Sequence, residues 1–209
     1  APVVDLHDPN SPAIGRLGRS FSADPDTVTR VAASFIDAHR AQGLMTALKH
    51  FPGHGSARHD SHDGFVDITA TWRPDELQPF FALIRSGKAD TIMTAHVFHD
   101  DFDRSHPATL SKSVITDLLR GMLGFDGVVI SDDLTMKAID DSYSLEDAVL
   151  LAVDAGVDVL LTGNFEPDTL DQAQAIREIL VGAVETGRLT RQRLQESHDR
   201  ILALRQRLR

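Results

Sequence analysis

Short apolar segments alternate with longer amphipathic segments along the chain. The short segments are apolar throughout, which is typical of strands buried on both faces of a parallel sheet. We predict five such strands, at residues 1–6, 44–48, 91–97, 127–130 and 157–162. The longer segments repeat apolar residues every three or four positions, which predicts helices. The predicted helices cover residues 25–42, 74–86, 113–123, 144–155, 169–185 and 191–207.

The first predicted helix has clear signals at both ends. Asp24 is a favourable N-cap, Pro25 suits the first helical position, and Gly43 suits the turn that ends a helix. The apolar stripe of each helix predicts its buried residues. We expect burial of Val28, Val31, Ala32, Phe35 and Ile36 in the first helix, of Leu77, Phe80, Phe81 and Ile84 in the second, and of Ile115, Leu118, Leu119 and Met122 in the third.

Each predicted strand ends in polar residues or is followed directly by them. They are Asp5, Lys49, His50, His96, Asp132, Asp133 and Asn164. Because parallel strands point the same way, these residues gather at one edge, which carries the active site in a (β/α)8 barrel. We therefore predict an α/β fold of the (β/α)8 TIM-type barrel, of which this chain supplies about five βα units. A doubly wound sheet is the alternative, although it usually concentrates polar residues at one switch point.

Composition and charge limit the classes of function. The formal net charge is −10 and is spread along the chain, which argues against nucleic acid as a partner. No apolar stretch is long enough to span a membrane. The absence of cysteine excludes disulfides and thiolate catalysis, and it fits a bacterial cytoplasmic protein as well as an exported one. The length of 209 residues is sufficient for one domain with a sizeable core.

One segment concentrates the polar chemistry of the chain. Residues 49–62, KHFPGHGSARHDSH, contain a lysine, four histidines and an aspartate. Pro52, Gly53 and Gly55 interrupt regular structure and let the backbone turn tightly. By itself this composition fits an active-site loop, a metal site or a solvated polar loop.

Two adjacent aspartates follow the most apolar strand. Strand alternation places Asp132 on the face of Val128 and Ile130 and places Asp133 on the opposite face, so the two carboxylates should have different roles. A carboxylate at a strand end can act as a nucleophile, a general base, a metal ligand or a helix cap. Our hypothesis is that at least one of the pair is catalytic and that Asp133 binds nearby backbone amides.

Four segments carry the most specific information. They are KHFPGHG at residues 49–55 with Asp60-Ser61-His62 after it, RSFSADP at residues 19–25, MTAHV at residues 93–97, and FDGVVISDDLTM at residues 125–136. Together and in this order they resemble the β-N-acetylglucosaminidase branch of glycoside hydrolase family 3. The resemblance covers essentially the whole chain, and it implies that residues 1–209 belong to one catalytic barrel domain.

The resemblance implies roles for eight residues. Asp132 matches the nucleophile that forms a covalent glycosyl-enzyme, and Asp60 and His62 match a dyad in which the histidine is the acid/base. The residues that match sugar-binding positions are Lys49, His50, Arg19, His96 and Met136. The implied reaction is retaining, exo-acting hydrolysis of terminal β-linked N-acetylglucosamine in a glycan, and peptidoglycan fragments are one candidate source. No cofactor or metal ion is implied.

The dyad residues are physically suited to this role. An unperturbed histidine titrates at about 6.5, so it can give and take a proton near neutrality. An aspartate hydrogen-bonded to one ring nitrogen would select the tautomer and stabilise the imidazolium. A spacing of two residues in an extended loop would point Asp60 and His62 apart. The dyad therefore requires the chain to turn at Ser61.

Three alternatives remain open at this point. An N-acetylglucosaminide phosphorylase would use the same residues, because a histidine acid/base avoids the repulsion between a second carboxylate and phosphate. An incomplete barrel could also act only as a binding module or scaffold. A metal-dependent barrel hydrolase could take its ligands from His50, His54, His59, His62, Asp60, His96, Asp132 and Asp133.

The number of strands leads to a further expectation. A closed barrel needs eight βα units, whereas five are visible in this chain. In the family that the chain resembles, about three units precede the strand at residue 1. We therefore expect a missing N-terminal barrel segment, or a partner chain, to complete the barrel.

Overall fold

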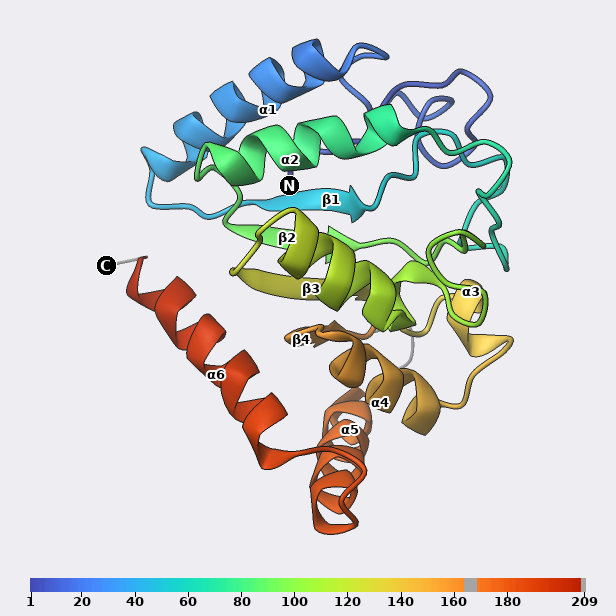
Figure 1. Ribbon diagram of the computed structural model, residues 1–209, viewed down its shortest axis with the longest axis vertical. Helices are drawn as coiled ribbons and strands as arrows, with labels where there is room; N and C mark the ends of the chain where they lie inside the picture. Colours follow the sequence, from blue (N-terminus) through green and yellow to red (C-terminus); the bar gives the residue numbers. More distant parts are fainter. Residues whose placement is uncertain (164–168, 208–209) are drawn as a thin grey trace.

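The computed structural model describes residues 1–163 and 169–207. Its centre is a four-stranded parallel sheet in which the strands lie in chain order (Figure 1). The strands are β1 Ala47–Phe51, β2 Thr91–Thr94, β3 Val128–Asp133 and β4 Val159–Leu161. A helical segment connects each strand to the next, so the chain has the repeating βα architecture predicted from its apolar pattern.

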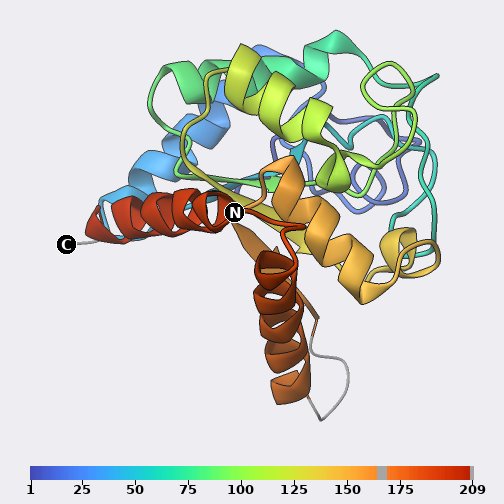
Figure 2. The same cartoon turned by 60° about the horizontal axis from the view of Figure 1, so that its bottom comes forward.

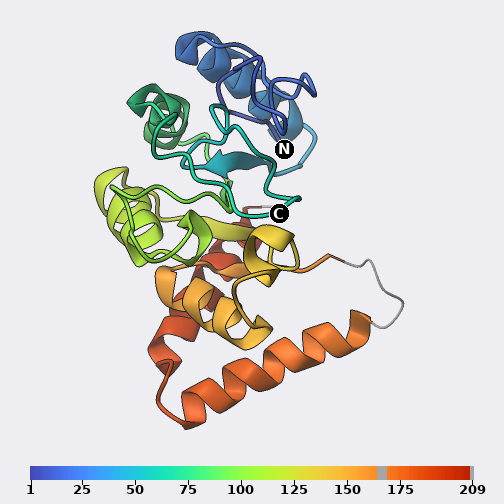
Figure 3. The same ribbon diagram turned by 90° about the vertical axis from the view of Figure 1, so that its right-hand side faces the viewer.

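Helices cover one face of the sheet, as in the outer layer of a (β/α)8 barrel (Figure 3). They are α2 Gln78–Arg85, η3 Ser113–Met122 and α4 Leu145–Ala155, with α1 Pro25–Arg40 beside α2. One hydrophobic cluster fills the space between strands and helices. Its fully buried members include Leu48, Phe51, Phe80, Ile92, Ile115 and Val129. The sheet therefore forms an arc of a TIM-type barrel, as predicted.

The predicted first strand is much shorter in the structure. Residues 1–6 form only one isolated parallel bridge, between Val3 and Lys49, and Val4 N–H donates to the Lys49 carbonyl at 2.8 Å. Pro2 has no amide hydrogen to extend the pairing, and the side chain of Asp5 binds amides beyond β1. The described residues thus form four strands, and residues 1–6 contribute one bridge in place of the fifth predicted strand.

The other strands differ from their predicted bounds, because burial and hydrogen-bonded pairing do not coincide. β1 begins three residues late and includes Lys49 and His50, while Leu44 is exposed. β3 extends through Asp132 and Asp133, which were predicted to lie beyond it. β2 and β4 are shorter than their apolar segments. Asn164, the predicted polar residue after the last strand, lies outside the described residues.

The first helix begins at its expected cap, but the buried faces of the helices are narrower than predicted. Asp24 accepts the Thr27 N–H at 2.9 Å at the start of α1, and Ser144 caps α4 in the same way. Because each helix contacts the sheet from one side only, residues at the margins of its stripe reach solvent. Three residues predicted to be buried are exposed for this reason, namely Val31, Phe81 and Met122.

Several helical segments are not simple α-helices. The predicted helix at residues 74–86 begins as a 3₁₀ turn before α2, and the hydrogen bonds of η3 follow π-helical spacing. Two short helical segments, η2 Ala108–Leu110 and α3 Lys137–Asp140, were not predicted. The remaining bounds are η1 Pro74–Leu77, α5 Thr169–Glu185 and α6 Arg191–Gln206.

The last two helices lie at the margin of the sheet. α6 crosses the edge at which the strands begin, and α5 extends away from the body of the molecule (Figures 1 and 2). A second, smaller apolar cluster joins α4 to α5 and to the turn after α5, through Leu150, Val153, Ala183 and Leu189. Among the residues that the structure describes, no helix combines the length and the apolar character needed to cross a membrane.

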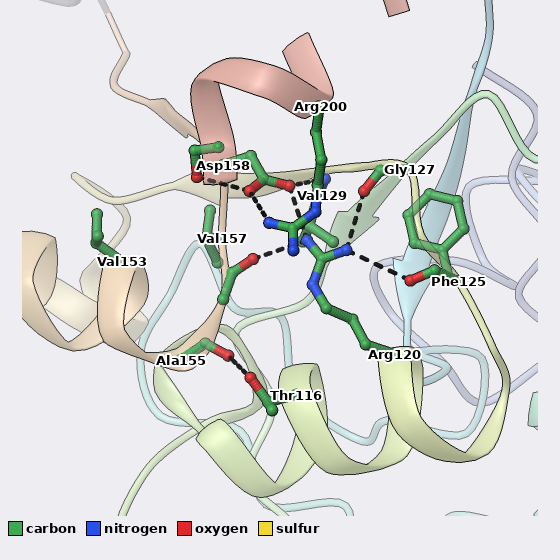
Figure 4. A network of polar contacts seen from close by, with 12 residues as sticks. Thr116, Arg120, Phe125, Gly127, Val129, Val153, Ala155, Val157, Asp158 and Arg200 are labelled. Carbon is green, nitrogen blue, oxygen red and sulfur yellow. Dashed lines mark hydrogen bonds and ion pairs between the residues drawn. The ribbon is translucent and has the colours of Figure 1, made fainter. Parts of the chain in front are cut away.

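A buried aspartate connects α6 to the sheet (Figure 4). Asp158 lies immediately before β4, and its side chain is fully buried. Its carboxylate accepts hydrogen bonds from Val129 N–H (3.0 Å), Arg120 (2.7 Å), Ser197 Oγ (2.6 Å) and Arg200 (3.0 Å), and Arg193 lies 3.6 Å away. One carboxylate thus links η3, β3 and α6 at the edge of the sheet opposite to the predicted site.

Candidate active site

The edge at which the strands end carries most of the predicted site residues. Lys49 and His50 lie within β1, His96 follows β2, and Asp132 and Asp133 end β3. Side chains at this edge come from neighbouring parallel strands, so they can face one ligand. The side chain of Lys49 is half-buried, and that of His50 is buried.

Asp5 is the carboxylate around which the histidine segment is arranged. It is fully buried and accepts hydrogen bonds from the main-chain amides of His50 (3.1 Å) and His54 (2.8 Å). The ring Nδ1 of His50 lies 2.7 Å from the same carboxylate. The sequence placed Asp5 at a strand end but gave it no role, because its partners are 45 and 49 residues away.

These partners also decide the ionisation of Asp5. Burial by itself raises the pKa of Asp5, because a carboxylate loses its hydration. The electrostatic attraction and hydrogen bond of His50, together with the contributions of His54, outweigh burial and lower the pKa below its ordinary value. Asp5 therefore remains an anion that holds both histidines in place.

Arg19 and His50 contact each other directly. A guanidinium nitrogen of Arg19 lies 3.2 Å from Nε2 of His50, and another donates to the Ala13 carbonyl at 3.0 Å. Because a guanidinium group can only donate, Nε2 of His50 accepts, and the ring proton is on Nδ1, facing Asp5. Arg19 and His50, which both match sugar-binding positions, are thus held in place by one chain of polar contacts that starts at Asp5.

The dyad predicted from the sequence is present as a contact. Ring Nδ1 of His62 lies 2.7 Å from Oδ1 of Asp60, and the His62 amide donates to the same oxygen at 3.0 Å. The loop therefore turns at Ser61, as the pairing requires. Burial raises the pKa of Asp60, but the two hydrogen bonds and the charge of His62 outweigh it and lower the pKa. His62 is 66 % exposed, so its Nε2 side is open to a substrate.

His54 lies inside the loop rather than at its surface. It is buried, and its Nε2 is 3.3 Å from the Ser61 hydroxyl. Burial is the main reason that the pKa of His54 is lowered, so its ring is neutral near pH 7. His54 therefore links the part of the loop that Asp5 holds to the turn that carries the dyad. By contrast, His59 is exposed.

A second polar chain supports the end of β3. Nε2 of His96 lies 2.8 Å from the Asp133 carbonyl, which can only accept, so the ring proton is on Nε2. Burial lowers the pKa of His96, and its Nδ1 lies 2.8 Å from the Thr109 hydroxyl, which donates to the Ala95 carbonyl at 3.0 Å. Thr109 in turn contacts the Thr94 hydroxyl at 2.8 Å, and Thr94 accepts the Asp132 amide at 3.4 Å.

Asp132 and Asp133 differ in their environment, as strand alternation predicted. Oδ1 of Asp133 accepts the amides of Thr135 (2.9 Å) and Gly163 (2.8 Å) and therefore holds the loops after β3 and β4. Oδ1 of Asp132 accepts only the adjacent Asp133 amide, at 2.9 Å. Met136 is buried and donates its amide to the Asp133 carbonyl at 3.1 Å.

Electrostatic influence connects the parts of this site. Burial is the largest cause of the lowered pKa of His96, and the charge of Asp132 partly offsets it. In the same way the charge of Asp60 partly offsets the effect of burial on the pKa of His54. His96 is thus coupled electrostatically to the end of β3, and His54 to the loop that carries the dyad.

The candidate metal ligands do not come together. In residues 1–163 and 169–207, no group of three or more His, Cys, Asp or Glu side chains has a geometry that could hold a metal ion. Instead, His50, His54 and His62 are each paired with a protein oxygen.

Comparison with known proteins gives a consistent result. The chain matches the family described as "Glycosyl hydrolase family 3 N terminal domain" over residues 1–204. It is 34% identical to the "Beta-hexosaminidase A" of Pseudoalteromonas piscicida and 42% identical to the "Beta-hexosaminidase" of Tolumonas auensis. These alignments cover 100% and 78% of this chain, but only 37% and 49% of the two relatives.

A solved structure agrees along the entire chain. A glycoside hydrolase family 3 β-N-acetylglucosaminidase from Paenibacillus sp. str. FPU-7 superimposes with a TM-score of 0.91 at 37% identity. The match covers 100% of this chain and 39% of the Paenibacillus chain. The chain thus spans between about a third and a half of the length of these relatives.

Proposed function

The chain belongs to the glycosyl hydrolase family 3 N terminal domain family, and we propose that it carries the catalytic groups of a retaining, exo-acting β-N-acetylglucosaminidase. The Asp60–His62 pair supports this proposal most directly, because it is built as an oriented acid/base with one open ring nitrogen. Asp132 ends a strand on the same edge and has no cation bonded to it among the described residues. Both β-hexosaminidase relatives and the Paenibacillus enzyme are consistent with this substrate class.

The proposed reaction has two steps. In the first, a carboxylate oxygen of Asp132 attacks the anomeric carbon while His62 donates a proton from Nε2 to the departing oxygen. Asp60 stabilises the imidazolium of His62 before this transfer and keeps Nε2 directed at the substrate. In the second, His62 takes a proton from water, and the water oxygen replaces Asp132 at the anomeric carbon.

The substrate-binding part of the proposal concerns the other matched residues. Arg19 and Lys49 supply cationic donors suited to sugar hydroxyl oxygens, and Asp5 holds Arg19 in place through His50. Met136 and His96 lie in the buried support of the same edge. We propose that these groups bind the terminal N-acetylglucosamine, and that peptidoglycan fragments are a natural source of it.

The function is tested with an aryl β-N-acetylglucosaminide. We expect release of the aryl alcohol together with N-acetylglucosamine of retained β configuration, observed by NMR before mutarotation. The same rates and products are expected with and without inorganic phosphate. Formation of a sugar phosphate at the expense of free sugar would instead identify a phosphorylase, and absence of turnover in either condition would contradict the enzyme proposal.

Replacing the proposed acid/base should affect poor leaving groups most. His62→Ala is expected to lower kcat/KM by about 10²- to 10⁴-fold for substrates whose leaving group needs protonation, and far less for acidic phenols. Asp60→Ala should cause a smaller loss of the same kind, because the imidazole remains without its orienting partner. The measurement is the rate across aryl glycosides of graded leaving-group acidity. His59→Ala, an exposed histidine of the same loop, is the matched control, and an equal loss for all substrates in His62→Ala would contradict the acid role.

The open edges of the sheet motivate a proposal about the rest of the barrel. β4 ends the sheet with Leu161 40 % exposed, and at the other edge only Val3 bridges Lys49. Unpaired strand edges present free amides and carbonyls to other chains. We propose that further polypeptide, an N-terminal barrel segment or a partner chain, pairs with these edges and completes the sugar-binding wall.

Residues 1–209 expressed alone should therefore be a poor enzyme. We expect kcat/KM at least about 100-fold below that of the complete protein, because small errors in positioning already cost about this much. Light scattering and the hydrolysis rate of both proteins measured side by side provide the test. A monomer of residues 1–209 with full activity would contradict the need for further polypeptide.

A further inference from the structure

A buried glutamate lies directly behind the histidine loop. Glu76, in η1, is fully buried, and its Oε2 accepts the Gly55 amide at 3.0 Å. The approach is so close that a Cβ added at Gly53 would lie 2.6 Å from the Glu76 Cβ. Gly53 also has φ of +119°, so glycine is required here for two independent reasons. Glu76 is therefore packed against the loop that leads to the proposed acid/base.

Glu76 is poorly satisfied as an anion. Within the described residues its buried Oε1 has no hydrogen bond of normal geometry, and the buried hydroxyl of the neighbouring Ser56 lowers the pKa of Glu76 by less than burial raises it. No cation forms an ion pair with Glu76 within the described part of the chain, where Arg73 exerts only a minor attraction. Asp5, the anion that holds the other side of the same loop, repels a charge on Glu76. An ionised Glu76 in this position would both lose its hydration and be repelled by the negative charge of Asp5.

Asp5 and Glu76 are equally buried but differ in the number of hydrogen-bond donors around their carboxyl groups. Both carboxyl groups are fully buried and both bind amides of the same loop. Asp5 has two amides and an imidazole as partners, and its pKa is lowered. Glu76 has one amide, and burial raises its pKa to about 7. Under equal burial, the pKa values of the two carboxyl groups are therefore shifted in opposite directions, according to the donors around each group.

We propose that Glu76 is a positioning residue of the catalytic loop and that it works in its neutral, protonated form. As a carboxylic acid it accepts the Gly55 amide at Oε2, and its O–H on Oε1 donates to the Ser56 hydroxyl. Gly55 follows His54, whose ring contacts Ser61 at the turn of the dyad. Loss of the proton places a second buried anion beside Asp5, and the loop then yields at Gly55 and moves the Asp60–His62 pair. The catalytic part of this proposal rests on the proposed glycosidase function.

The direction of the pH effect follows from the raised pKa. Between about pH 4.5 and 7 the folded protein holds a proton on Glu76 that the unfolded chain has lost. The stabilisation from the neutral acid is complete below this window, falls as the pH rises through it, and is absent above it. Glu76→Gln keeps a neutral group of the same shape, so it removes this dependence. Relative to this variant, the wild type should therefore lose stability from pH 4.5 to 7.

The experiment compares Glu76→Gln with the wild-type protein in complete form. Infrared difference spectra should show a protonated carboxyl band that disappears as the pH passes about 7 and is missing in Glu76→Gln. The melting-temperature difference between the two proteins should grow over the same range. Glu185→Gln, an exposed glutamate, is the matched control and should retain both wild-type signals. These two readouts do not depend on activity.

The activity profile then tests the positioning role. The kcat/KM of the wild type divided by that of Glu76→Gln should fall by about tenfold from pH 6 to pH 8. The reason is that the protonated fraction of a group that titrates near pH 7 falls by about tenfold over this range. An identical profile in both proteins would overturn the positioning role. Absence of the infrared band would overturn the neutral acid itself. If neither protein hydrolyses the substrate, the proposed function fails, while the band and the melting temperatures still decide the state of Glu76.

Discussion

Asp132→Asn is expected to abolish hydrolysis of an aryl β-N-acetylglucosaminide while leaving the fold intact. The amide cannot form the covalent glycosyl ester, so the loss should be on the order of 10⁵-fold, comparable to removal of other catalytic nucleophiles. The fold should survive because Oδ1 of an asparagine can still accept the Asp133 amide, the one hydrogen bond that the Asp132 side chain makes in the described structure. Urea unfolding should therefore give nearly equal midpoints for both proteins.

Covalent labelling identifies the nucleophile independently of the rate. A slow fluoro-sugar substrate should label Asp132 of the wild type, and mass spectrometry of its peptides locates the modified residue. Asp126→Asn, an exposed aspartate of the same segment, is the matched control and should retain full activity and labelling. A label on Asp133, or an active enzyme without any label, would show that the nucleophile has been misassigned.

Of the variants proposed here, Asp158→Ala should cause the largest loss in the free energy of unfolding. The substitution leaves the guanidinium groups of Arg120, Arg193 and Arg200 without their shared anion and removes the partner of the Val129 amide (Figure 4). The side chain of Asp158 is fully buried, so its removal leaves these donors around a space that the carboxylate had filled. Breaking a buried pair in this way typically costs about 3–5 kcal/mol. Because a domain has only about 5–15 kcal/mol of stability, the variant should be close to unfolding.

A neighbouring ion pair provides the control for this effect. Asp154 and Lys112 are separated by 3.9 Å, and both side chains are more than 60% exposed. Asp154→Ala should therefore change the free energy of unfolding by less than about 1 kcal/mol. Urea denaturation of the wild type and of both variants measures the two effects under one condition. Equal losses in the two variants would mean that the Asp158 network does not hold α6 to the sheet.

The arrangement of elements was largely predictable from the sequence. Apolar segments without alternation indicated strands covered on both faces, and the three- to four-residue periods between them indicated the helices that cover the sheet. Local capping chemistry identified the start of α1 at Asp24. These features depend on residues close together in the chain, so periodicity and caps are enough to recognise them.

The exact strand bounds and the exposed residues at the margins of the helices could not be predicted, because they depend on contacts with residues distant in the sequence. The apolar pattern marks burial, whereas a strand ends where hydrogen-bonded pairing ends, so β1 moved onto Lys49 and His50 and the first strand became a bridge at Val3. Val31, Phe81 and Met122 carry the period of their helices but face away from the sheet. Which residues of a stripe are covered depends on the orientation of the neighbouring element.

The sequence by itself determined which groups form the dyad and which strand end carries the paired aspartates. The family resemblance implied the pairing of Asp60 and His62, which requires the turn at Ser61. Strand alternation predicted a separate structural role for Asp133, whose contact with the Thr135 amide is local, whereas its contact with the Gly163 amide joins residues 30 positions apart. Only the tertiary structure decided that Asp5 and Glu76 hold the same loop from opposite sides. Their charge states depend on how many donors surround each buried carboxyl group. That number is set by backbone amides brought together from distant segments, so the position of a residue in the sequence does not reveal it.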